Sequence, residues 1–258
     1  MEMKILLSTL VHNTPDLADN MLKQWNQEQN FVNDHCEIMI VDNGSDQNNI
    51  SKSTTHRLET NVFFGGGCNV IMDYFLQGDY DYLLLFNSDI IYHGYNFLNI
   101  AFKEIIKHNI DIYTPSVING KIEQCKWKTV HNWGTGGVRK VKYIDDQSPI
   151  FSRRMIEKLY PFPDSLYLGY GTDFHECIIA NRNNFNIGVS DNLTVCHLEN
   201  YTVQTDKLTS ITKQQYWNDN YHNMMNHFNS SEYAQEYKDL FKYGEDYNYT
   251  NESGDFLY

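Results

Sequence analysis

The sequence predicts an α/β protein built around a mostly parallel central sheet flanked by helices. Short apolar segments alternate with segments of helical periodicity through the first half of the chain, the order expected for strands joined by helices. The segment 82–86 is a continuous apolar run, which is typical of a central strand buried on both faces. Polar residues follow several predicted strands, as they do where strands end at a ligand-binding edge.

The first half of the chain contains four predicted strands with helices between them. One helix should begin at Thr14-Pro15, because Thr is a favourable N-cap and Pro suits the first helical position. A second should open at the triple glycine 65–67 and close near Gly78. A third is expected at 95–107. The predicted strands are 5–7, 37–41, 82–86 and 110–114.

The second half of the chain has a different pattern. Alternating residues at 138–144 predict a hairpin strand, and 148–152 predict a strand that leads into a helix around Met155. After His197, aromatic residues at helical spacing predict a C-terminal helical extension, with a polar, frayed tail from Tyr243 onward.

These patterns predict a domain with an appended helical extension, which suits a length of 258 residues. The extension lacks a strongly basic polar face, so we expect it to pack on the domain or between copies of the chain rather than on a membrane. The predicted ranges are 1–204 for the domain, with halves 1–115 and 116–204, and 205–258 for the extension.

Composition restricts the partners. The formal net charge is −13, so the surface as a whole should repel nucleic-acid backbones and anionic lipids. A nucleic-acid partner would need a local basic patch, and the candidates are Arg139, Lys140 and Lys142, or Arg153-Arg154. Five scattered cysteines without a C-x-x-C pair indicate neither a disulfide framework nor a zinc site. With no signal peptide and no membrane-spanning stretch in the sequence, we expect a cytoplasmic protein.

Polar residues collect at the carboxyl ends of three predicted strands. Ligands of open α/β sheets bind beyond these ends, so the side chains should line one crevice that could hold a base, a ribose and a metal ion. A single Asp after a strand is more often a turn or cap residue, and the prediction therefore depends on their convergence. The residues are His12-Asn13, Asp42-Asn43 and Asn87-Ser88-Asp89.

Four segments of the chain occur in an order that is characteristic of one enzyme family. They are 41–46 (VDNGSD), 61–69 (NVFFGGGCN), 85–89 (LFNSD) and 169–173 (GYGTD). Together they resemble the inverting glycosyltransferases of family 2, which have the GT-A fold, and in particular the rhamnosyltransferase-like branch. The resemblance extends over roughly the first 200 residues, and four segments in order are more specific than any one alone.

The resemblance implies metal-dependent transfer of a sugar from a nucleotide-diphosphate sugar to a hydroxyl group. Asp42 would bind the base or ribose, Asn69 would lie in the helix beside the donor, and Asp89 would meet Mn²⁺ or Mg²⁺. The further candidates for donor binding are Thr9, Asn13, Asn43, Gly66, Gly67, Asn87 and Ser88.

The implied cation has a defined chemical task. A nucleoside diphosphate leaving group gains negative charge as the glycosidic bond breaks, and a divalent cation with oxygen ligands offsets it. Asn87 stands where many relatives have a first Asp, so Asp89 carries the metal prediction. His197 matches the position of a further ligand, and imidazole suits Mn²⁺. Its alternative is a histidine buried in the core or on an edge strand.

An inverting transfer needs a carboxylate that takes the proton of the acceptor hydroxyl. The resemblance points to Asp173, in the first turn of a helix for which Thr172 is the candidate N-cap. The alternative for Asp173 is an acid that complements the helix dipole. Relatives carry Glu-Asp-x-Asp here, so acceptor contacts would fall to His175 or Glu176. Trp133, in a glycine-rich loop, is either a further acceptor contact or a plain surface residue.

Rival functions make different demands on the sequence. The triple glycine fits neither a dinucleotide-binding fingerprint nor a phosphate-binding P-loop, so close backbone packing is its expected use. A nucleotidyltransferase should have a glycine-rich, basic loop after the first strand, which 8–13 lacks. A non-catalytic nucleotide- or sugar-binding module would tolerate loss of Asp89 and Asp173, and both are present.

The identity of the acceptor stays open. The resemblance makes a glycan or a lipid-linked saccharide the default hydroxyl acceptor. Modified bases of phage DNA are the alternative, which the acidity of the chain disfavours.

Overall fold

The computed structural model describes residues 3–92, 96–119, 125–198, 211–230, 232–249 and 256–257. The expected helix start at Tyr95 and the expected boundary between 204 and 205 lie outside these residues. The strands are β1 (Ile5–Val11), β2 (Cys36–Asn43), β3 (His56–Leu58), β4 (Tyr82–Asn87), β5 (Ile90–Tyr92), β6 (Ile112–Asn119), β7 (Val138–Val141), β8 (Ile150–Ser152), β9 (Ile187–His197) and β10 (Phe256–Leu257). The α-helices are α1 (Pro15–Asn26), α2 (Gln29–His35), α3 (Phe63–Gln77), α4 (Phe97–His108), α5 (Arg153–Leu159), α6 (Thr172–Arg182), α8 (Lys213–Ser230) and α9 (Ala234–Asp246).

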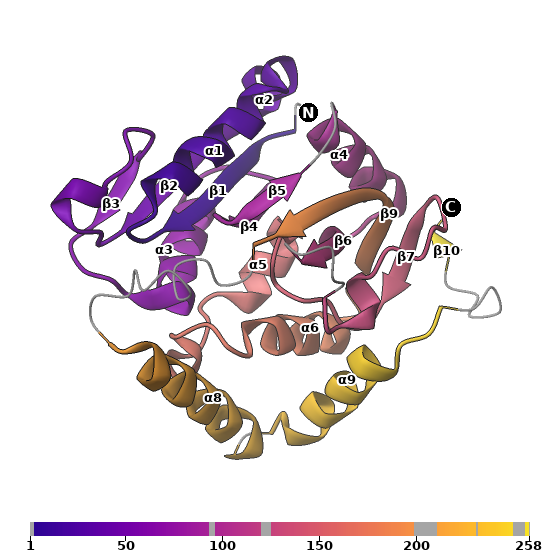
Figure 1. Cartoon of the computed structure of the whole chain (residues 1–258). Coiled ribbons are helices and arrows are strands. Elements are labelled where there is room, and N and C mark those ends of the chain that lie inside the picture. The colour runs from indigo at the N-terminus through magenta and orange to yellow at the C-terminus, as the bar shows by residue number, and fades with distance from the viewer. Residues whose placement is uncertain are drawn as a thin grey trace.

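In the described part of the chain, one ten-stranded sheet forms the centre, in the order β10-β7-β9-β6-β8-β4-β1-β2-β3, with β5 paired to β9 (Figure 1). Strands β1 to β4 are parallel to one another where they pair. Strand β8 lies antiparallel between β4 and β6, and β7 lies antiparallel to β9. The α/β class is thus confirmed. The sheet is mixed rather than mostly parallel, because β8, in the middle of the sheet, runs antiparallel to both of its neighbours.

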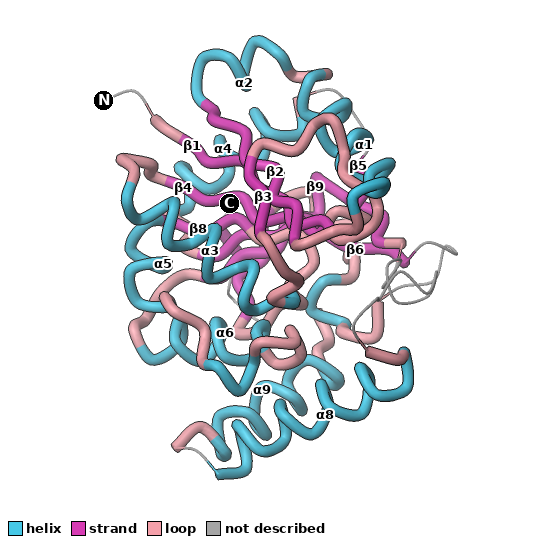
Figure 2. The backbone as a smooth tube through the Cα atoms, turned by 90° about the vertical axis from the view of Figure 1, so that its left-hand side faces the viewer, coloured by secondary structure: helices cyan, strands magenta, loops and turns pink. Residues whose placement is uncertain are grey.

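Helices cover both faces of the sheet. Figure 2 shows α1, α2 and α4 on one side, α3, α5 and α6 on the other, and α8 with α9 as a further layer beyond α6. The apolar runs of β1 and β4 are buried as predicted, with Leu6, Leu7 and Leu84 fully inaccessible. Burial of such side chains on both faces is the main stabilising contribution to a central strand.

The triple glycine allows α3 to pack closely against its surroundings. A Cβ atom on Gly67 would lie 2.4 Å from a methyl carbon of Leu10 in β1. One on Gly65 would lie 2.4 Å from the carbonyl oxygen of Leu166. Close backbone packing is therefore the use of these two glycines, as expected.

The second half differs in part from the prediction. Strand β8 and helix α5 are as expected, and the hydroxyl of Ser152 caps α5 by accepting from the Met155 amide. The segment 138–144 does not form a hairpin, because β7 pairs with the distant β9. The predicted polar tail is partly structured: α9 continues to Asp246, and β10 pairs antiparallel with β7.

The C-terminal helices α8 and α9 pack onto the rest of the chain. Phe228 of α8 is fully buried, and Tyr237 of α9 belongs to the same core. Arg182 at the end of α6 binds Glu232 at 2.7 Å and Glu236 at 2.6 Å. None of the described helices is long and apolar enough to cross a membrane.

Candidate active site

Asp89 and His197 lie side by side because β5 pairs with β9. The register places Ile90 opposite His197, and the Leu198 amide donates to the Asp89 carbonyl at 3.0 Å. Oδ1 of Asp89 is then 3.2 Å from Nε2 of His197, and both side chains are about nine-tenths buried. The two predicted metal ligands thus meet at one point of the fold.

Helix α1 supports the opposite edge of β5. The side-chain amide of Gln24 donates to the Ile90 carbonyl at 3.1 Å and accepts from the Tyr92 amide at 2.8 Å. These are the hydrogen bonds that a neighbouring strand would otherwise make. The short strand that follows Asp89 is therefore held on both edges.

The donor set fits a divalent cation that also binds a substrate. Asn87 adds a buried Oδ1 that has no hydrogen-bond partner among the described residues. Across the described part of the chain, no three His, Cys, Asp or Glu side chains are grouped so that they could hold a metal ion alone. Mg²⁺ commonly takes one or two protein ligands and completes its shell with phosphate oxygens and water. The Asp89 carboxylate matches that mode of binding, and the His197 imidazole adds a nitrogen beside it.

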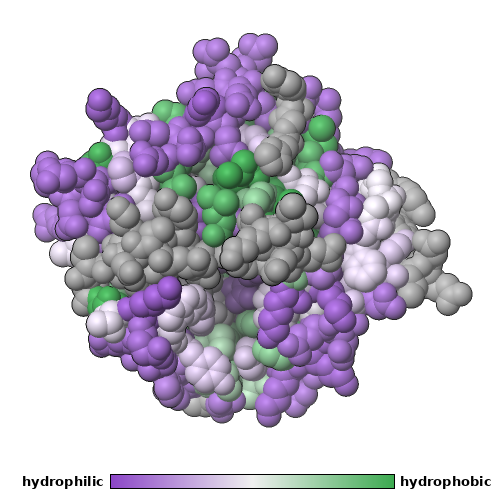
Figure 3. Space-filling view, viewed as in Figure 1, coloured by the Kyte–Doolittle hydropathy of each residue, from purple (hydrophilic) through white to green (hydrophobic). Residues whose placement is uncertain are grey.

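A cavity of about 1000 Å³ opens next to this pair. Asn87 and His197 line it together with Asp145, Asp146 and Asp173. Figure 3 shows the corresponding hollow between α8 and α9, below the grey atoms. The remaining wall is largely aromatic and apolar, and comes mainly from 125–127, α6, α8 and α9. It includes Trp127, Phe174, Tyr216, Tyr221, Met224, Met225, Tyr237 and Phe241.

Asp173 lies in the first turn of α6, as predicted, and faces this cavity. The N-cap of α6 is Gly171 rather than Thr172, because the helix already begins at Thr172. The φ angle at Gly171 is +87°, which suits glycine. The Thr172 hydroxyl instead donates to the Gly169 carbonyl at 2.7 Å. Burial, and next the charge of Asp145, raise the pKa of Asp173 to about 7, although a hydrogen bond from the Tyr143 hydroxyl opposes the rise. A carboxylate of this kind suits proton transfer near neutral pH.

Two acids of the cavity, Asp145 and Asp146, were not predicted. Asp145 accepts from the Cys125 thiol at 3.1 Å and from the side chain of Gln147. Burial, and next the charge of Asp173, raise the pKa of Asp146 well above its usual value. The only signal in the sequence is two consecutive acids just before the predicted strand 148–152.

The structure places His175 and Glu176 in the packing of α6, away from the cavity lining. Burial, and next the charge of His227, lower the pKa of His175 to about 4, so its ring is neutral at pH 7. Glu176 is fully buried, and neither carboxyl oxygen has a hydrogen-bond partner among the described residues. Burial and the nearby acids raise the pKa of Glu176 well above its usual value.

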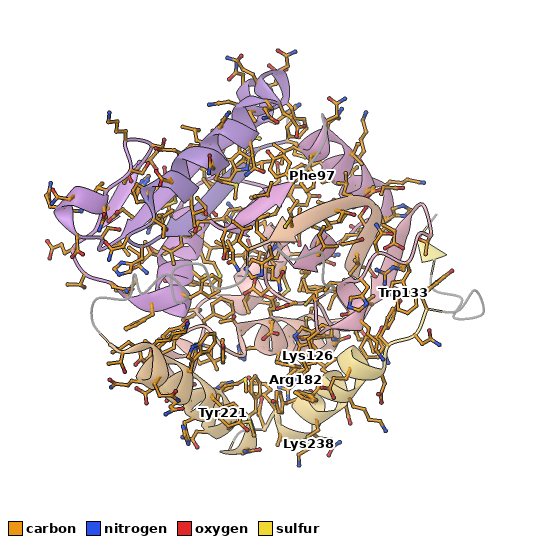
Figure 4. All side chains as sticks on the ribbon, viewed as in Figure 1. Phe97, Lys126, Trp133, Arg182, Tyr221 and Lys238 are labelled. Carbon is orange, nitrogen blue, oxygen red and sulfur yellow. The ribbon has the colours of Figure 1, made fainter. Side chains whose placement is uncertain are left out.

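Trp133 also lies away from the cavity. Its indole N–H donates to the Lys128 carbonyl at 3.0 Å, and its ring packs edge-on against Tyr247. Figure 4 places Trp133 far from Tyr221, which does line the cavity. The tryptophan at the cavity is instead Trp127.

The donor-side candidates are buried at the carboxyl ends of β1 and β2. Asp42 accepts from the Ser45 amide at 3.0 Å, and Asn13 accepts from the Asp46 amide at 2.9 Å. Thr9 is fully buried within β1. These contacts hold the ends of the two strands in a fixed arrangement, and φ of Asn13 is +56°, a left-handed conformation that asparagine adopts more readily than most residues.

Two asparagines hold segments next to α3. Asn43 accepts from the Val62 amide at 2.9 Å and donates to the Phe63 carbonyl at 3.1 Å. Asn69 makes the same paired contact with the backbone of Phe162, at 2.7 and 3.1 Å. Both side-chain amides are thus used by the protein itself. Ser88 lies partly buried in the turn between β4 and β5.

The arginines of the candidate basic patches are used for internal contacts. Arg139 is buried and binds the Asp191 carboxylate at 3.0 Å. Arg154 pairs with Asp111, and Arg153 donates to the carbonyl of Tyr80. Lys140 and Lys142 are exposed, and Arg154 is half-exposed although it pairs with Asp111.

Comparisons with known proteins identify the fold. No protein-family model matches the sequence, and no curated protein is similar to it in sequence. The structure is similar to that of S. aureus TarS, with a TM-score of 0.59 and 15% identity over 90% of this chain and 45% of that one. It is similar to TarS 1-349 in complex with UDP-GlcNAc, with a TM-score of 0.58 and 17% identity over 89% of this chain and 74% of that one.

A further similar structure is GalNAc-T7 with UDP, GalNAc and Mn²⁺, with a TM-score of 0.58 and 12% identity over 93% of this chain and 50% of that one. The chain thus spans about half the length of GalNAc-T7 and of the longer TarS chain. At these identities the likeness shows the fold. The chain has the α/β fold of GT-A glycosyltransferase structures, with a mixed, curled sheet.

Proposed function

We propose that this protein is a metal-dependent, inverting glycosyltransferase of the family 2 type, which transfers a sugar from a nucleotide-diphosphate sugar to a hydroxyl acceptor. One observation carries the proposal: a single cavity brings together the metal-side residues Asn87 and His197 and the carboxylate of Asp173. The GT-A fold, and similar structures that contain UDP-GlcNAc or UDP with Mn²⁺, support it.

The donor would bind at the carboxyl edge of β1, β2 and β4. Asp42 is the proposed contact of the base or ribose, at the end of β2. Asp89 and His197 are the proposed ligands of Mn²⁺ or Mg²⁺, because they provide an oxygen and a nitrogen 3.2 Å apart. The chemistry supplied by a cation held there is neutralisation of charge on the leaving diphosphate.

The acceptor would occupy the cavity between α6 and the C-terminal helices. Asp173 takes the proton of its hydroxyl group as the oxygen forms the new bond to the anomeric carbon. The bond from that carbon to the diphosphate breaks on the opposite face, and the nucleoside diphosphate leaves with the electron pair.

A donor screen tests the proposal. Release of nucleoside diphosphate is measured with a panel of nucleotide sugars, with and without Mn²⁺, for the wild type, Asp89→Ala and the control Glu59→Ala. Glu59 is an exposed acid outside the cavity. We expect Mn²⁺-dependent release that Asp89→Ala removes and Glu59→Ala retains.

Four outcomes would overturn parts of this proposal. Turnover without metal, or an unimpaired Asp89→Ala protein, would reject the metal site. An Asp173→Asn protein that binds the donor and transfers at the wild-type rate would reject the assigned base. Donor binding without turnover across the panel and across glycan acceptors would favour a non-catalytic binding module.

A further inference from the structure

Tyr143 contacts the proposed base directly. It is fully buried, and its hydroxyl donates a hydrogen bond to Oδ2 of Asp173. Its ring stacks on Phe174 with centroids 4.6 Å apart, and Trp127 meets it edge-on at 5.1 Å. The aromatic contacts leave the ring little freedom, so the position of the hydroxyl is set by packing.

Helix α9 packs against the same ring. A Cβ atom on Gly244 would lie 2.8 Å from Cδ1 of Tyr143 and 2.9 Å from Cε3 of Trp127. Gly244 is buried and helical, where alanine would otherwise be preferred by about 1 kcal/mol. Absence of a side chain there thus allows the C-terminal extension to pack directly against Tyr143.

We propose that Tyr143 is a positioning residue for the transfer reaction, held by α9 so that its hydroxyl fixes the carboxylate of Asp173 in the orientation that lines the acceptor cavity. This inference rests on the proposed function, in which Asp173 receives the acceptor proton. It also gives the C-terminal extension a part in the chemistry, because the contact at Gly244 determines where the hydroxyl lies.

The surroundings of Asp173 explain why this hydrogen bond matters. The groups that face it from the adjacent loop, from α6 and from α9 are acids, a thiol and a phenol. Burial and the charge of Asp145 raise the pKa of Asp173 to about 7. The hydrogen bond from the Tyr143 hydroxyl stabilises the ionised form of Asp173 and so opposes this rise. Burial and the neighbouring carboxylates raise the pKa of Tyr143 itself, which keeps it a donor. The groups are Asp145, Asp146, Glu176, Cys177 and Tyr237, with Lys126, Lys238 and His197 elsewhere on the cavity lining.

The first test is the pH dependence of transfer by Tyr143→Phe. This variant keeps the ring and deletes the hydroxyl. We expect the acid limb of the kcat profile to move up by about one to two pH units, the effect of a lost charge-assisted hydrogen bond, with recovery at high pH. The matched control is Tyr113→Phe, which removes a buried hydroxyl bonded to Glu104 and should leave the profile in place. A uniform loss of rate at every pH would overturn the inference.

The second test does not depend on activity. The carboxyl carbon of Asp173 is followed by NMR in protein labelled at aspartate, and is assigned by its absence in Asp173→Asn. We expect a higher pKa of Asp173 in Tyr143→Phe than in the wild type. If no donor is turned over but this shift occurs, the effect of the Tyr143 hydroxyl on Asp173 is confirmed, whereas the proposed function fails and the role of Tyr143 in transfer fails with it. If transfer occurs without the shift, the inference fails and the proposed function stands.

A third variant tests the role of α9 and serves if Tyr143→Phe does not fold. Gly244→Ala should displace the ring of Tyr143 and move the pKa of Asp173 in the same direction. Its control is Gly137→Ala, because a Cβ atom on Gly137 meets nothing within 4 Å. An unchanged Asp173 titration in a folded Gly244→Ala protein would overturn the coupling to α9.

Discussion

Nε2 of His197 lies 3.2 Å from Oδ1 of Asp89, although the two residues belong to different halves of the chain. The pairing of β5 with β9 produces this contact, since the register sets Ile90 opposite His197. A metal ligand pair made by backbone pairing is stiff, because moving either side chain would disturb a strand of the sheet. The expected effects of mutation therefore differ sharply between neighbouring positions of β9.

Metal binding should depend on His197 and not on its neighbour in the strand. Successive side chains of a strand point to opposite faces, so Cys196 faces away from His197. We expect His197→Ala to weaken Mn²⁺ binding in the presence of a nucleoside diphosphate by about tenfold or more, judged from typical effects of perturbing metal sites. Cys196→Ala should bind normally. Electron paramagnetic resonance of free Mn²⁺ measures both, and equal losses would contradict the assignment.

Replacement of the proposed base, Asp173, should reduce the rate of transfer without changing the affinity for the donor. Asp173→Asn keeps the size of the side chain but cannot accept the acceptor proton. We expect kcat to fall by about 10² to 10⁴, with donor affinity unchanged. Because the pKa of Asp173 is raised to about 7, the wild-type rate should rise with pH through that value and then level off. Steady-state kinetics between about pH 5 and 9 test both statements, and a rate that falls over this range would refute the role of Asp173.

The buried acids should make the protein more stable at mildly acidic pH. Burial raises the pKa values of Glu176 and Asp146 in the folded protein. The folded protein therefore binds the protons of these two carboxyl groups more tightly than the unfolded chain does. This stability is fully present below the unfolded pKa of about 4 and is lost as pH rises through the folded values. Thermal melts should show a higher Tm at about pH 5.5 than at about pH 8.5.

Replacement of one acid by its neutral isostere isolates this contribution. Glu176→Gln should raise Tm at the alkaline end and reduce the difference between the two pH values. The exposed Glu59→Gln should leave the difference unchanged. An undiminished difference in Glu176→Gln would show that the charge of Glu176 is not its source.

The buried pair of Arg139 and Asp191 should be important for stability. Nε and Nη2 of Arg139 donate to the Asp191 carboxylate, and the guanidinium also binds the carbonyls of Thr129 and His131. Asp191→Asn would leave a buried charge without compensation, at a cost of about 3–5 kcal/mol. Glu245→Gln, in an exposed pair with Lys126, should cost less than about 1 kcal/mol. Urea unfolding distinguishes the two, and similar midpoints would contradict this account.

The sequence alone could predict the elements whose signals are local. Strands β1, β2 and β4 have apolar runs that end in polar residues, so both the strands and their polar ends could be located. Thr14-Pro15 likewise marked the start of α1. These predictions needed no knowledge of distant contacts.

Features that depend on distant pairing were missed or wrong. Strand β9 was not predicted, because its interior contains Asp191, whose charge is compensated by the distant Arg139 and by hydrogen bonds from Ser116 and Thr135. Asp145 and Asp146 look like ordinary loop acids until α6 brings Asp173 beside them. Trp127 and Trp133 lie close in sequence, and only the packing of α9 shows which of them lines the cavity.

The contact of Gln24 with β5 also protects the protein from self-association. A strand edge with unpaired amide and carbonyl groups is a template for pairing with another molecule, and proteins cover such edges to avoid aggregation. The side chain of Gln24 occupies the carbonyl of Ile90 and the amide of Tyr92, and so closes the edge of β5 with a single residue. One amide thus serves in place of an additional strand. Replacing Gln24 by a residue that cannot both donate and accept would expose an unpaired strand edge next to the proposed metal ligands.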